Sequence, residues 1–563
     1  METGLLAVSA WSGLDTTILI AFFAGLIGII IWVLMQKEET SQDYFLAGRN
    51  AGWVSIGSSI FASNIGSEHL VGLSGVGFVS GMAMAHWEMH AWLILVLGWV
   101  FVPFYDRIKI FTMPEYLEHR FSPGSRSILS LISLVSYVLT KVAVTVYSGG
   151  VVFGTVFGIT RVPDNVPLIG GMDMFWVSAI GLVVITGLYT VMGGMKAVMY
   201  TSVLQTPVLL IGSIVILIVG LMRVGGWGEV ERICGPNLKL VRPASDPEFP
   251  WTGVLFGSMI IGFWYWCTDQ YIVQRVLSGK NQREARRGTI LAGYFKLLPV
   301  FIFLVPGMIA YALTQKGLLN MPLTAEGKPD ADAAFSTLVS QLLPIGFKGF
   351  VVCGLLAALM SSLASLFNSS AALFVGDFYK KLRPNASEKH LVVVGRIATA
   401  TVVILGIVWI PVMKGMGNVL YRYLQAVQGL LAPAIAAAFV MGVFWKRATA
   451  MGGFWGLVVG FVLGMFRLTL DVMKGHLTEG TFLYWAANVN WLHYCEFLFV
   501  LCVTVTVLVS LMTPPPSSQQ IRYTYYAATP EEKAATRASW NKWDVIHTLI
   551  ILGVIVAFYI YFW

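Results

Sequence analysis

The chain has 563 residues, of which 57% are hydrophobic and only 12% are charged. Soluble domains carry about 25% charged residues, so this composition excludes an ordinary soluble protein and indicates one with many membrane-spanning segments. The formal net charge of +8 does not indicate nucleic-acid binding, because the Lys and Arg residues gather in loops between apolar runs.

Apolar runs of about 20 residues, the length that spans a bilayer, recur along the whole chain. They cover 17–35, 52–78, 81–105, 126–156, 172–192, 200–222, 252–277, 289–314, 345–376, 391–413, 418–444, 450–470, 491–512 and 544–562. We therefore expect an all-α membrane protein with about fourteen transmembrane helices. The first run follows no positive patch of the kind that precedes a cleaved signal peptide.

The positive charges of the loops predict the orientation. Lys and Arg concentrate in alternate loops, for example in 275–287 and 380–389, and such loops face the cytoplasm. With an even number of helices, both termini are expected outside. The external loops contain no Asn-x-Ser/Thr glycan acceptor, which favours a bacterial inner membrane.

The second apolar run is interrupted by polar residues in 61–70, which reads Phe61-Ala62-Ser63-Asn64-Ile65-Gly66-Ser67-Glu68-His69-Leu70. Polar groups at mid-depth in a membrane usually face a cavity or a pathway. Gly66 allows the backbone to leave the helix, and a broken helix exposes carbonyl groups that can coordinate a small cation. Polar packing between two helices is the alternative.

The third run contains Glu88 between His86 and His90. A carboxylate in a spanning run requires a partner or a wet cavity, so Glu88 is a candidate functional residue. His86 and His90 lie four residues apart, as zinc ligands can, but on a regular helix Glu88 is about 200° from each of them. We therefore expect both histidines to be packing or interfacial residues.

A second interrupted run covers 257–270, where Gly257 and Gly262 precede the polar stretch Thr268-Asp269-Gln270. Two interrupted segments, each of which opens a group of five helices, are typical of an inverted-repeat transporter with a binding site near the middle of the membrane.

Two further polar residues lie within apolar runs. Lys296 is about two turns inside its run, where both a functional role and an extended side chain that reaches the interface are open readings. Gln425 is a lone amide near the start of a later run, where a structural hydrogen bond between helices is the alternative.

A group of serines occupies neighbouring turns of the run at 345–376. Ser361, Ser362 and Ser365 follow Ala358, which lies one turn before the first two. Hydroxyl and carbonyl oxygens would together form an uncharged site that suits Na⁺, because hard cations take oxygen ligands. Serine-mediated helix packing is the alternative.

No enzyme motif is present: the sequence contains no phosphate-binding P-loop, no GxSxG and no paired cysteine motif. We therefore expect no enzyme activity. Near the C-terminus, Thr529-Pro530-Glu531-Glu532 predicts the start of a short cytoplasmic surface helix before the last span.

Four stretches resemble the sodium/solute symporter family and are most similar to its sodium/glucose cotransporter branch. They are Asp43-Tyr44-Phe45-Leu46-Ala47-Gly48-Arg49, Ala62-Ser63-Asn64-Ile65-Gly66-Ser67-Glu68-His69, Trp264-Tyr265-Trp266-Cys267-Thr268-Asp269-Gln270 and Leu359-Met360-Ser361-Ser362-Leu363-Ala364-Ser365-Leu366-Phe367-Asn368-Ser369. The resemblance runs from about Asp43 to Arg467 and implies a LeuT-type core of two inverted five-helix repeats. The expected parts are an N-terminal helix and loop at 1–50, the first repeat at 51–225, an external loop at 226–251, the second repeat at 252–447, and peripheral helices at 448–563 with a polar linker at 513–541.

The resemblance also implies the site residues. The sodium ligands correspond to the carbonyl groups of Ala62, Ile65 and Ala358 and the hydroxyl groups of Ser361 and Ser362. The sugar-binding positions correspond to Asn64, His69, Glu88, Tyr265, Trp266, Lys296 and Gln425. The gate residues correspond to Leu73, Trp87 and Tyr421 on the outer side and Tyr265 on the inner side.

Two positions depart from the family pattern. Gly262 stands where sugar carriers often have a polar side chain, and Ser202 stands where many members have an Asp associated with sodium exit or a second sodium ion. Because Ser202 is neutral, we expect one Na⁺ per sugar.

The resemblance implies sodium-coupled uptake of a monosaccharide of the glucose or galactose type by alternating access. The expected partners are the sugar, Na⁺ and the lipid bilayer, without nucleic acid, and the functional unit is expected to be a monomer. Another polar solute, such as an inositol or a sialic acid, is an alternative, and Glu88 opposes an anionic one because two carboxylates repel. A membrane sensor or a channel with the same fold is a further alternative.

Overall fold

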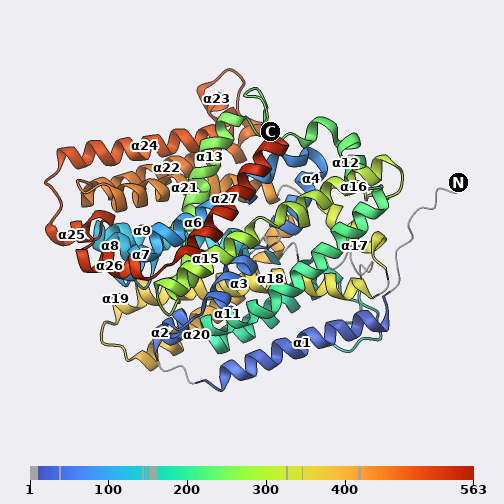
Figure 1. Ribbon diagram of the computed structural model, residues 1–563, viewed down its shortest axis with the longest axis horizontal. Coiled ribbons are helices and arrows are strands. Elements are labelled where there is room, and N and C mark those ends of the chain that lie inside the picture. Colours follow the sequence, from blue (N-terminus) through green and yellow to red (C-terminus); the bar gives the residue numbers. More distant parts are fainter. Residues whose placement is uncertain are drawn as a thin grey trace.

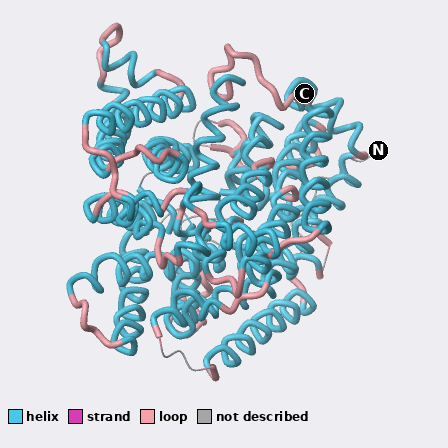
Figure 2. The backbone as a smooth tube through the Cα atoms, turned by 60° about the vertical axis from the view of Figure 1, so that its left-hand side comes forward, coloured by secondary structure: helices cyan, strands magenta, loops and turns pink. Residues whose placement is uncertain are grey.

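The computed structural model is helical, and the residues that it describes form no β-strand beyond isolated bridges (Figures 1 and 2). It describes residues 11–36, 40–66, 68–142, 145–146, 149–150, 161–324, 327–344, 346–415 and 420–563, without the side chains of 68, 135, 138–140, 409–415, 420–426 and 472. The predicted all-α class is confirmed.

The longer helices in chain order are α1 (Gly13–Leu34), α3 (Trp53–Asn64), α9 (Pro123–Ser136), α11 (Met174–Val224), α13 (Trp251–Phe263), α15 (Gln282–Lys296), α16 (Val305–Gln315), α18 (Phe347–Leu373), α20 (Glu388–Gly415), α21 (Leu420–Phe444), α22 (Ala450–Val472), α24 (Trp491–Met512) and α27 (Lys542–Phe562). The shorter helices are α2 (Ser41–Leu46), α4 (Ser74–Ser80), α5 (Ala85–Glu88), α6 (Ala91–Val96), α7 (Val102–Ile108), α8 (Met113–Arg120), α12 (Trp227–Cys234), α14 (Gln270–Leu277), α17 (Ala334–Leu342), α19 (Lys380–Leu382), α23 (Phe482–Asn488), α25 (Ser518–Arg522) and α26 (Pro530–Ala538). Several of them continue into π-helical stretches: η2 (Glu68–Leu73), η4 (Leu97–Phe101), η5 (Tyr137–Val142), η7 (Trp264–Thr268), η8 (Val300–Leu304) and η10 (Phe374–Tyr379).

Ten continuous helical segments among the described residues are long and apolar enough to cross a membrane. One of them, α11, has 51 residues and contains the non-helical residue Gly194 (φ 48°, ψ −145°). A straight helix of that length would be about twice as long as the bilayer is thick, so α11 holds both expected runs at 172–192 and 200–222. The expected runs at 52–78 and 252–277 are broken. The expected run at 126–156 extends into residues that are not described. The number of fourteen transmembrane helices is therefore not confirmed.

The first interruption lies where the sequence predicts it. Helix α3 ends at Asn64, Ile65 is extended (φ −78°, ψ 110°), and the chain becomes helical again at Glu68 in η2. The second interruption lies further along than its glycines suggest. Helix α13 continues through η7, and the break falls at Asp269 (φ −78°, ψ 128°), which caps α14.

The two glycines of the second interrupted run serve close packing instead of breaking the helix. A Cβ atom on Gly262 would lie 2.6 Å from Nδ1 of His90, and one on Gly257 would lie 3.0 Å from the carbonyl oxygen of Leu492. Both positions therefore bring a neighbouring element close to α13.

The broken helix α3–α4 packs against α15–α16 through glycines in both halves. On α3, a Cβ atom on Gly57 would lie 2.9 Å from the carbonyl oxygen of Gly288. On α4, a Cβ atom on Gly77 would lie 2.3 Å from the carbonyl oxygen of Leu304. On α16, a Cβ atom on Gly307 would lie 2.0 Å from the carbonyl oxygen of Ser74. The backbones are therefore in direct contact, as in small-residue interfaces of membrane helices.

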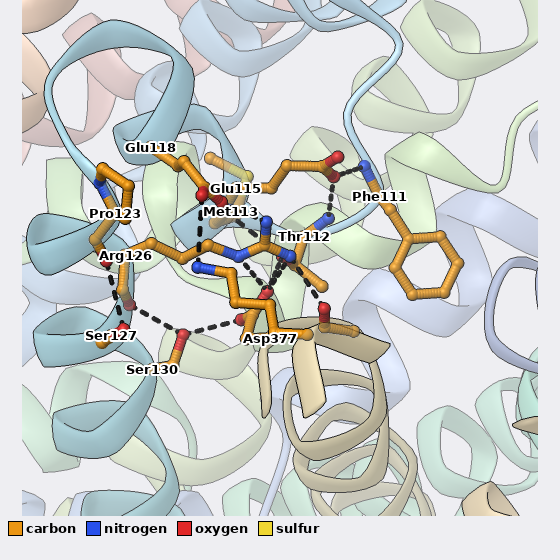
Figure 3. Close-up of polar contacts among 12 residues, drawn as sticks. Phe111, Thr112, Met113, Glu115, Glu118, Pro123, Arg126, Ser127, Ser130 and Asp377 are labelled. Atoms are coloured by element: carbon orange, nitrogen blue, oxygen red, sulfur yellow. Dashed lines mark hydrogen bonds and ion pairs between the residues drawn. The ribbon is translucent and has the colours of Figure 1, made fainter. Parts of the chain in front are cut away.

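A buried carboxylate holds the end of α18 that follows the serine group (Figure 3). Asp377 in η10 is 1% exposed and accepts hydrogen bonds from Thr112 at the start of α8 and from Ser130 on α9, each at 2.7 Å. The guanidinium group of Arg126 pairs with the same carboxylate and also with Glu118. A buried carboxylate requires such partners, so this network fixes α18 relative to α8 and α9.

Peripheral helices lie on opposite sides of the core (Figure 1). Helices α22 and α24 pack against α21 of the core near one edge, α1 packs on α11 and α18 near the other, and α27 lies against α6 and α15. The predicted surface helix is confirmed as α26, which is capped by Thr529 and has no buried residue.

The glycine contacts predict a loss of stability in Gly307→Ala. The new methyl group would overlap the carbonyl group of Ser74, so the helices must separate, and overpacking of this kind costs about 1–3 kcal/mol. We expect a lower midpoint of thermal unfolding for the detergent-purified variant. Gly181→Ala on α11 is the matched control, because a Cβ atom there meets nothing within 4 Å. Equal midpoints for the two variants would contradict the proposed contact.

Candidate functional site

A small cavity of about 70 Å³ lies between the two interrupted helices, α5, α15 and α21. Eight residues that the sequence assigned to substrate binding or gating line it: Asn64, His69, Leu73, Trp87, Glu88, Tyr265, Trp266 and Lys296. Four further lining residues were not assigned: His90, Ile261, Gly262 and Gln428.

Two assigned residues, Tyr421 and Gln425, lie on α21 outside the residues whose side chains the structure describes. Gln428, one helical turn beyond Gln425, does reach the cavity. Residues three apart share a helix face. The assignment of Gln425 to the substrate site could therefore have led to Gln428 as a second candidate.

The polar side of the cavity is a connected row of side chains. The ammonium group of Lys296 lies 2.6 Å from Oε2 of Glu88, and both residues are only 4% exposed. Nε2 of His69 lies 3.5 Å from Oε1 of Glu88 and 3.3 Å from Nδ2 of Asn64. Lys296 therefore does not extend to the membrane interface, and its charge and that of Glu88 compensate each other inside the protein.

Two solvent-inaccessible polar atoms of residues at this cavity have no hydrogen-bond partner among the described residues. They are Nδ1 of His69 and the indole Nε1 of Trp87, both buried. Buried polar atoms are normally paired, and an unpaired one in a native structure requires an explanation. Their residues line the cavity, so a polar ligand that enters it is the explanation we expect for both.

Aromatic rings form the remaining walls. The ring of Tyr265 meets that of Trp266 edge to face at 4.9 Å, and the ammonium group of Lys296 lies 5.3 Å from a ring centroid of Trp266. Carboxylate, ammonium and amide groups can bond the hydroxyl groups of a ligand, while aromatic faces cover its apolar parts. This combination suits a small ring that carries hydroxyl groups.

The expectation that Glu88 faces away from His90 is wrong. Helix α5 ends at Glu88, and His90 lies in the turn that starts α6, so the regular 100° rotation per residue does not apply. Glu88 and His90 consequently line the same cavity. His86 does pack elsewhere, with Nδ1 2.8 Å from the hydroxyl group of Tyr559, and the described residues contain no cluster of His, Cys, Asp or Glu that could hold a metal ion.

An aromatic layer covers the cavity near Leu73. Trp87 stacks on Trp491 of α24 with ring centroids 5.9 Å apart, and it meets Phe249 edge to face at 6.3 Å. Beyond this layer lies a larger cavity of about 690 Å³ that Phe249 and Trp491 also line. Trp87 therefore separates the two cavities, with two partners that the sequence did not indicate.

On the other side, Tyr265 rests on a buried ion pair. The ammonium group of Lys141 in η5 lies 3.3 Å from Oδ2 of Asp269, 4.7 Å from the ring centroid of Tyr265 and 4.5 Å from that of Tyr271. Tyr137 also donates a hydrogen bond to Asp269. The sequence contained a signal for this pair, because Lys141 is a cation within the apolar run at 126–156.

The expected sodium ligands come from two elements that meet. The hydroxyl group of Ser362 on α18 lies 3.0 Å from the carbonyl oxygen of Ser63 and 3.1 Å from that of Ile65 at the break. The hydroxyl groups of Ser63 and Ser365 lie 2.6 Å apart. Ala62 directly precedes Ser63, Ala358 lies one turn before Ser361 and Ser362, and both alanines are buried. The residues present are therefore neutral oxygen donors that fit a small hard cation.

Ser202 on α11 borders this group of oxygens. Its hydroxyl group lies 3.4 Å from that of Ser361 and donates to the carbonyl oxygen of Val198 at 2.6 Å. The position at which many relatives of the resembled family carry an Asp is therefore adjacent to the expected sodium ligands, and here it is neutral.

Comparison with known proteins adds independent information about the chain. The profile of the sodium:solute symporter family matches residues 44–460. The sodium/myo-inositol cotransporter of Canis lupus familiaris is 38% identical over 539 residues, which span 87% of this chain and 72% of that relative. The sodium/glucose cotransporter 1 of Oryctolagus cuniculus is 36% identical over 537 residues, which span 89% of this chain and 79% of that relative.

Solved structures show the same fold. A substrate-bound, outward-open sialic acid symporter coupled to Na⁺ is 20% identical, with a TM-score of 0.73 over 90% of this chain and 99% of that one. A nucleobase-cation-symport-1 family transporter in a closed conformation is 15% identical, with a TM-score of 0.50 over 87% of this chain and 99% of that one. The architecture is therefore that of LeuT-type transporters. The family profile and the two relatives together establish that this chain belongs to the sodium:solute symporter family and is a sodium-coupled solute transporter.

Proposed function

We propose that the chain takes up a neutral, polyhydroxylated ring, a monosaccharide of the glucose or galactose type, and that the ring binds at the cavity lined by Glu88, Lys296 and Trp266. The observation that carries the proposal is the row Asn64–His69–Glu88–Lys296 beside the rings of Trp266 and Tyr265. A carboxylate and an ammonium group that neutralise each other can bond several hydroxyl groups while the binding site stays uncharged overall.

A cyclic polyol such as myo-inositol is the second candidate. The Canis lupus familiaris relative, named a sodium/myo-inositol cotransporter, is as similar to this chain as the sodium/glucose cotransporters are. An inositol carries hydroxyl groups on every ring carbon, and it would use the same row of polar side chains. A sialic acid is disfavoured, because its carboxylate would face Glu88.

For the coupling ion we propose a site made of the carbonyl groups of Ala62, Ile65 and Ala358 and the hydroxyl groups of Ser361 and Ser362. The approach of Ser362 to the carbonyl oxygen of Ile65 supports it. The same break in the helix carries Asn64 and His69 into the substrate cavity. A cation that holds the broken backbone in place would therefore also hold two substrate-binding side chains in position, which provides a physical basis for coupling.

One Na⁺ per sugar supplies enough free energy for uptake. Moving one charge through 100 mV provides about 2.3 kcal/mol, and a tenfold sodium gradient adds about 1.4 kcal/mol. Together they support a sugar accumulation of roughly 500-fold. We further propose that the loops rich in Lys and Arg face the cytoplasm and that transport proceeds by alternating access.

The direct test is uptake by proteoliposomes that contain the purified protein. We expect an inward sodium gradient to drive accumulation of labelled glucose, galactose or myo-inositol, and no accumulation when choline replaces Na⁺. The ranking within this panel decides between the two candidates. Sodium-driven uptake of an anionic solute in preference to all three would contradict the proposal, and a solute-independent sodium current of single-channel type would indicate a channel.

The sodium site predicts the effect of Ser361→Ala. Loss of one ligand should raise the Na⁺ concentration required for half-maximal uptake, while the ranking of the sugars stays the same. Uptake rates measured against Na⁺ concentration provide the test, with Ser127→Ala on the exposed face of α9 as the control. Unchanged sodium dependence in Ser361→Ala would remove this residue from the site.

The substrate site predicts the effect of Glu88→Gln. The variant keeps the shape of the side chain but loses the anion, and a charge-assisted hydrogen bond contributes about 1.5–3 kcal/mol. We expect the apparent affinity for the sugar to fall roughly tenfold to a hundredfold, and His69→Ala and Gln425→Ala to weaken binding as well. Glu531→Gln on the exposed helix α26 is the control. If all three variants bind sugar as the unmodified protein does, the substrate site lies elsewhere.

The neutral Ser202 predicts one Na⁺ per sugar. Two cations about 10 Å apart repel by about 1.7 kcal/mol at an effective dielectric constant near 20, and Ser202 supplies no charge to offset that repulsion. We expect a Hill coefficient near one for activation by Na⁺. The reversal potential of the sugar-dependent current in proteoliposomes measures the coupling directly, and a value that requires two charges per sugar would refute this stoichiometry.

A further inference from the structure

His90 and Gly262 form a matched pair in the wall of the substrate cavity. His90 begins α6 and is 5% exposed, and Gly262 lies on α13 directly opposite its imidazole ring. An ideal Cβ atom on Gly262 would lie 2.6 Å from Nδ1 and 2.8 Å from Cε1 of His90, and 2.6 Å from Cδ1 of Leu93. These distances are shorter than any ordinary contact, so the ring can occupy this place only because residue 262 has no side chain.

The two nitrogens of His90 have different surroundings. Nε2 lies 3.3 Å from the hydroxyl group of Ser258 on α13. Nδ1, on the Gly262 side, makes no hydrogen bond to any residue that the structure describes. Because His90 and Gly262 both line the cavity, the imidazole ring that carries this unpaired nitrogen forms part of the cavity wall. The bond to Ser258 holds the ring in one orientation, as a binding group requires.

We propose that His90 binds the substrate and determines its specificity, by forming a hydrogen bond with one ring hydroxyl group that the Glu88–Lys296 pair does not contact. This inference rests on the proposed function, because it assumes a polyhydroxylated ring in the cavity. Imidazole is small and nearly flat, and a neutral one offers one donor and one acceptor. The hydroxyl group that it reaches decides which ring polyols are accepted, since a polar group that is left unpaired in such a site costs affinity.

The imidazole ring of His90 and a side chain at position 262 cannot occupy the cavity wall together. A methyl group at position 262 would displace the imidazole ring, so any side chain there removes His90 from its place in the wall. Gly262→Ala and His90→Leu should therefore change specificity in the same way, although the first leaves the histidine in the sequence. Two unrelated substitutions that produce one effect distinguish a specific contact from general damage to the cavity.

The test uses sodium-driven uptake by proteoliposomes. The substrates are the best transported of glucose, galactose and myo-inositol, together with its analogues that each lack one hydroxyl group. For His90→Leu we expect a threefold to tenfold loss of apparent affinity for the parent compound, the range for one neutral hydrogen bond. We expect no loss for the one analogue that lacks the contacted hydroxyl group. Gly262→Ala should show the same pattern, and His90→Gln, which keeps a donor and an acceptor, should restore part of the affinity.

His390→Leu, in an exposed histidine at the start of α20, is the matched control, and half-maximal Na⁺ concentrations confirm that each variant retains its sodium site. Equal losses for the parent and every analogue would show that the ring acts by packing alone and would overturn the inference, as would unchanged affinity in both variants. These outcomes leave the proposed function intact. If the unmodified protein transports none of the three polyols with Na⁺, the proposed function fails, and the inference fails with it.

Discussion

The structure depends on a break in one helix at mid-depth in the membrane, between Asn64 and Glu68. Lipid offers no hydrogen-bond partner, so each freed carbonyl group requires one from the protein or from a water-filled cavity. Ser362 and Tyr271 donate to the carbonyl oxygens near Ser63 and Ile65, which ties the break to α18 and α14. The same residues thereby bring the serine group, the polar row and the second interrupted helix to one place.

Buried charges occur in pairs on both sides of the substrate cavity. Lys296 pairs with Glu88 in its wall, and Lys141 pairs with Asp269 beneath Tyr265. An isolated charge in this environment is costly, and breaking one partner of such a pair leaves the other uncompensated. The two pairs therefore link α5 to α15 and η5 to the second break, so that the elements around the cavity are held by electrostatic contacts as well as by packing.

Much of this arrangement was accessible from the sequence. Polar residues in apolar runs indicated Asn64, His69, Glu88 and Lys296, because the membrane makes such residues expensive wherever they serve no purpose. His90 was misjudged, since periodicity assumes a regular helix and α5 ends two residues earlier. Trp491 could not be assigned at all: it comes from a peripheral helix far along the chain, and nothing in its local sequence distinguishes it from an interfacial tryptophan.

The glycine contacts between α4 and α16 have a consequence for movement. Their backbones touch at Gly77 and Gly307, with no layer of side chains between them, and Ser74 bonds the carbonyl oxygen of Phe303 at 2.9 Å. A shift of one helix along the other by even one residue would drive a side chain into the opposing backbone. The two helices are consequently expected to move as one rigid unit, which pivots at the break that follows Asn64, where Ile65 is extended.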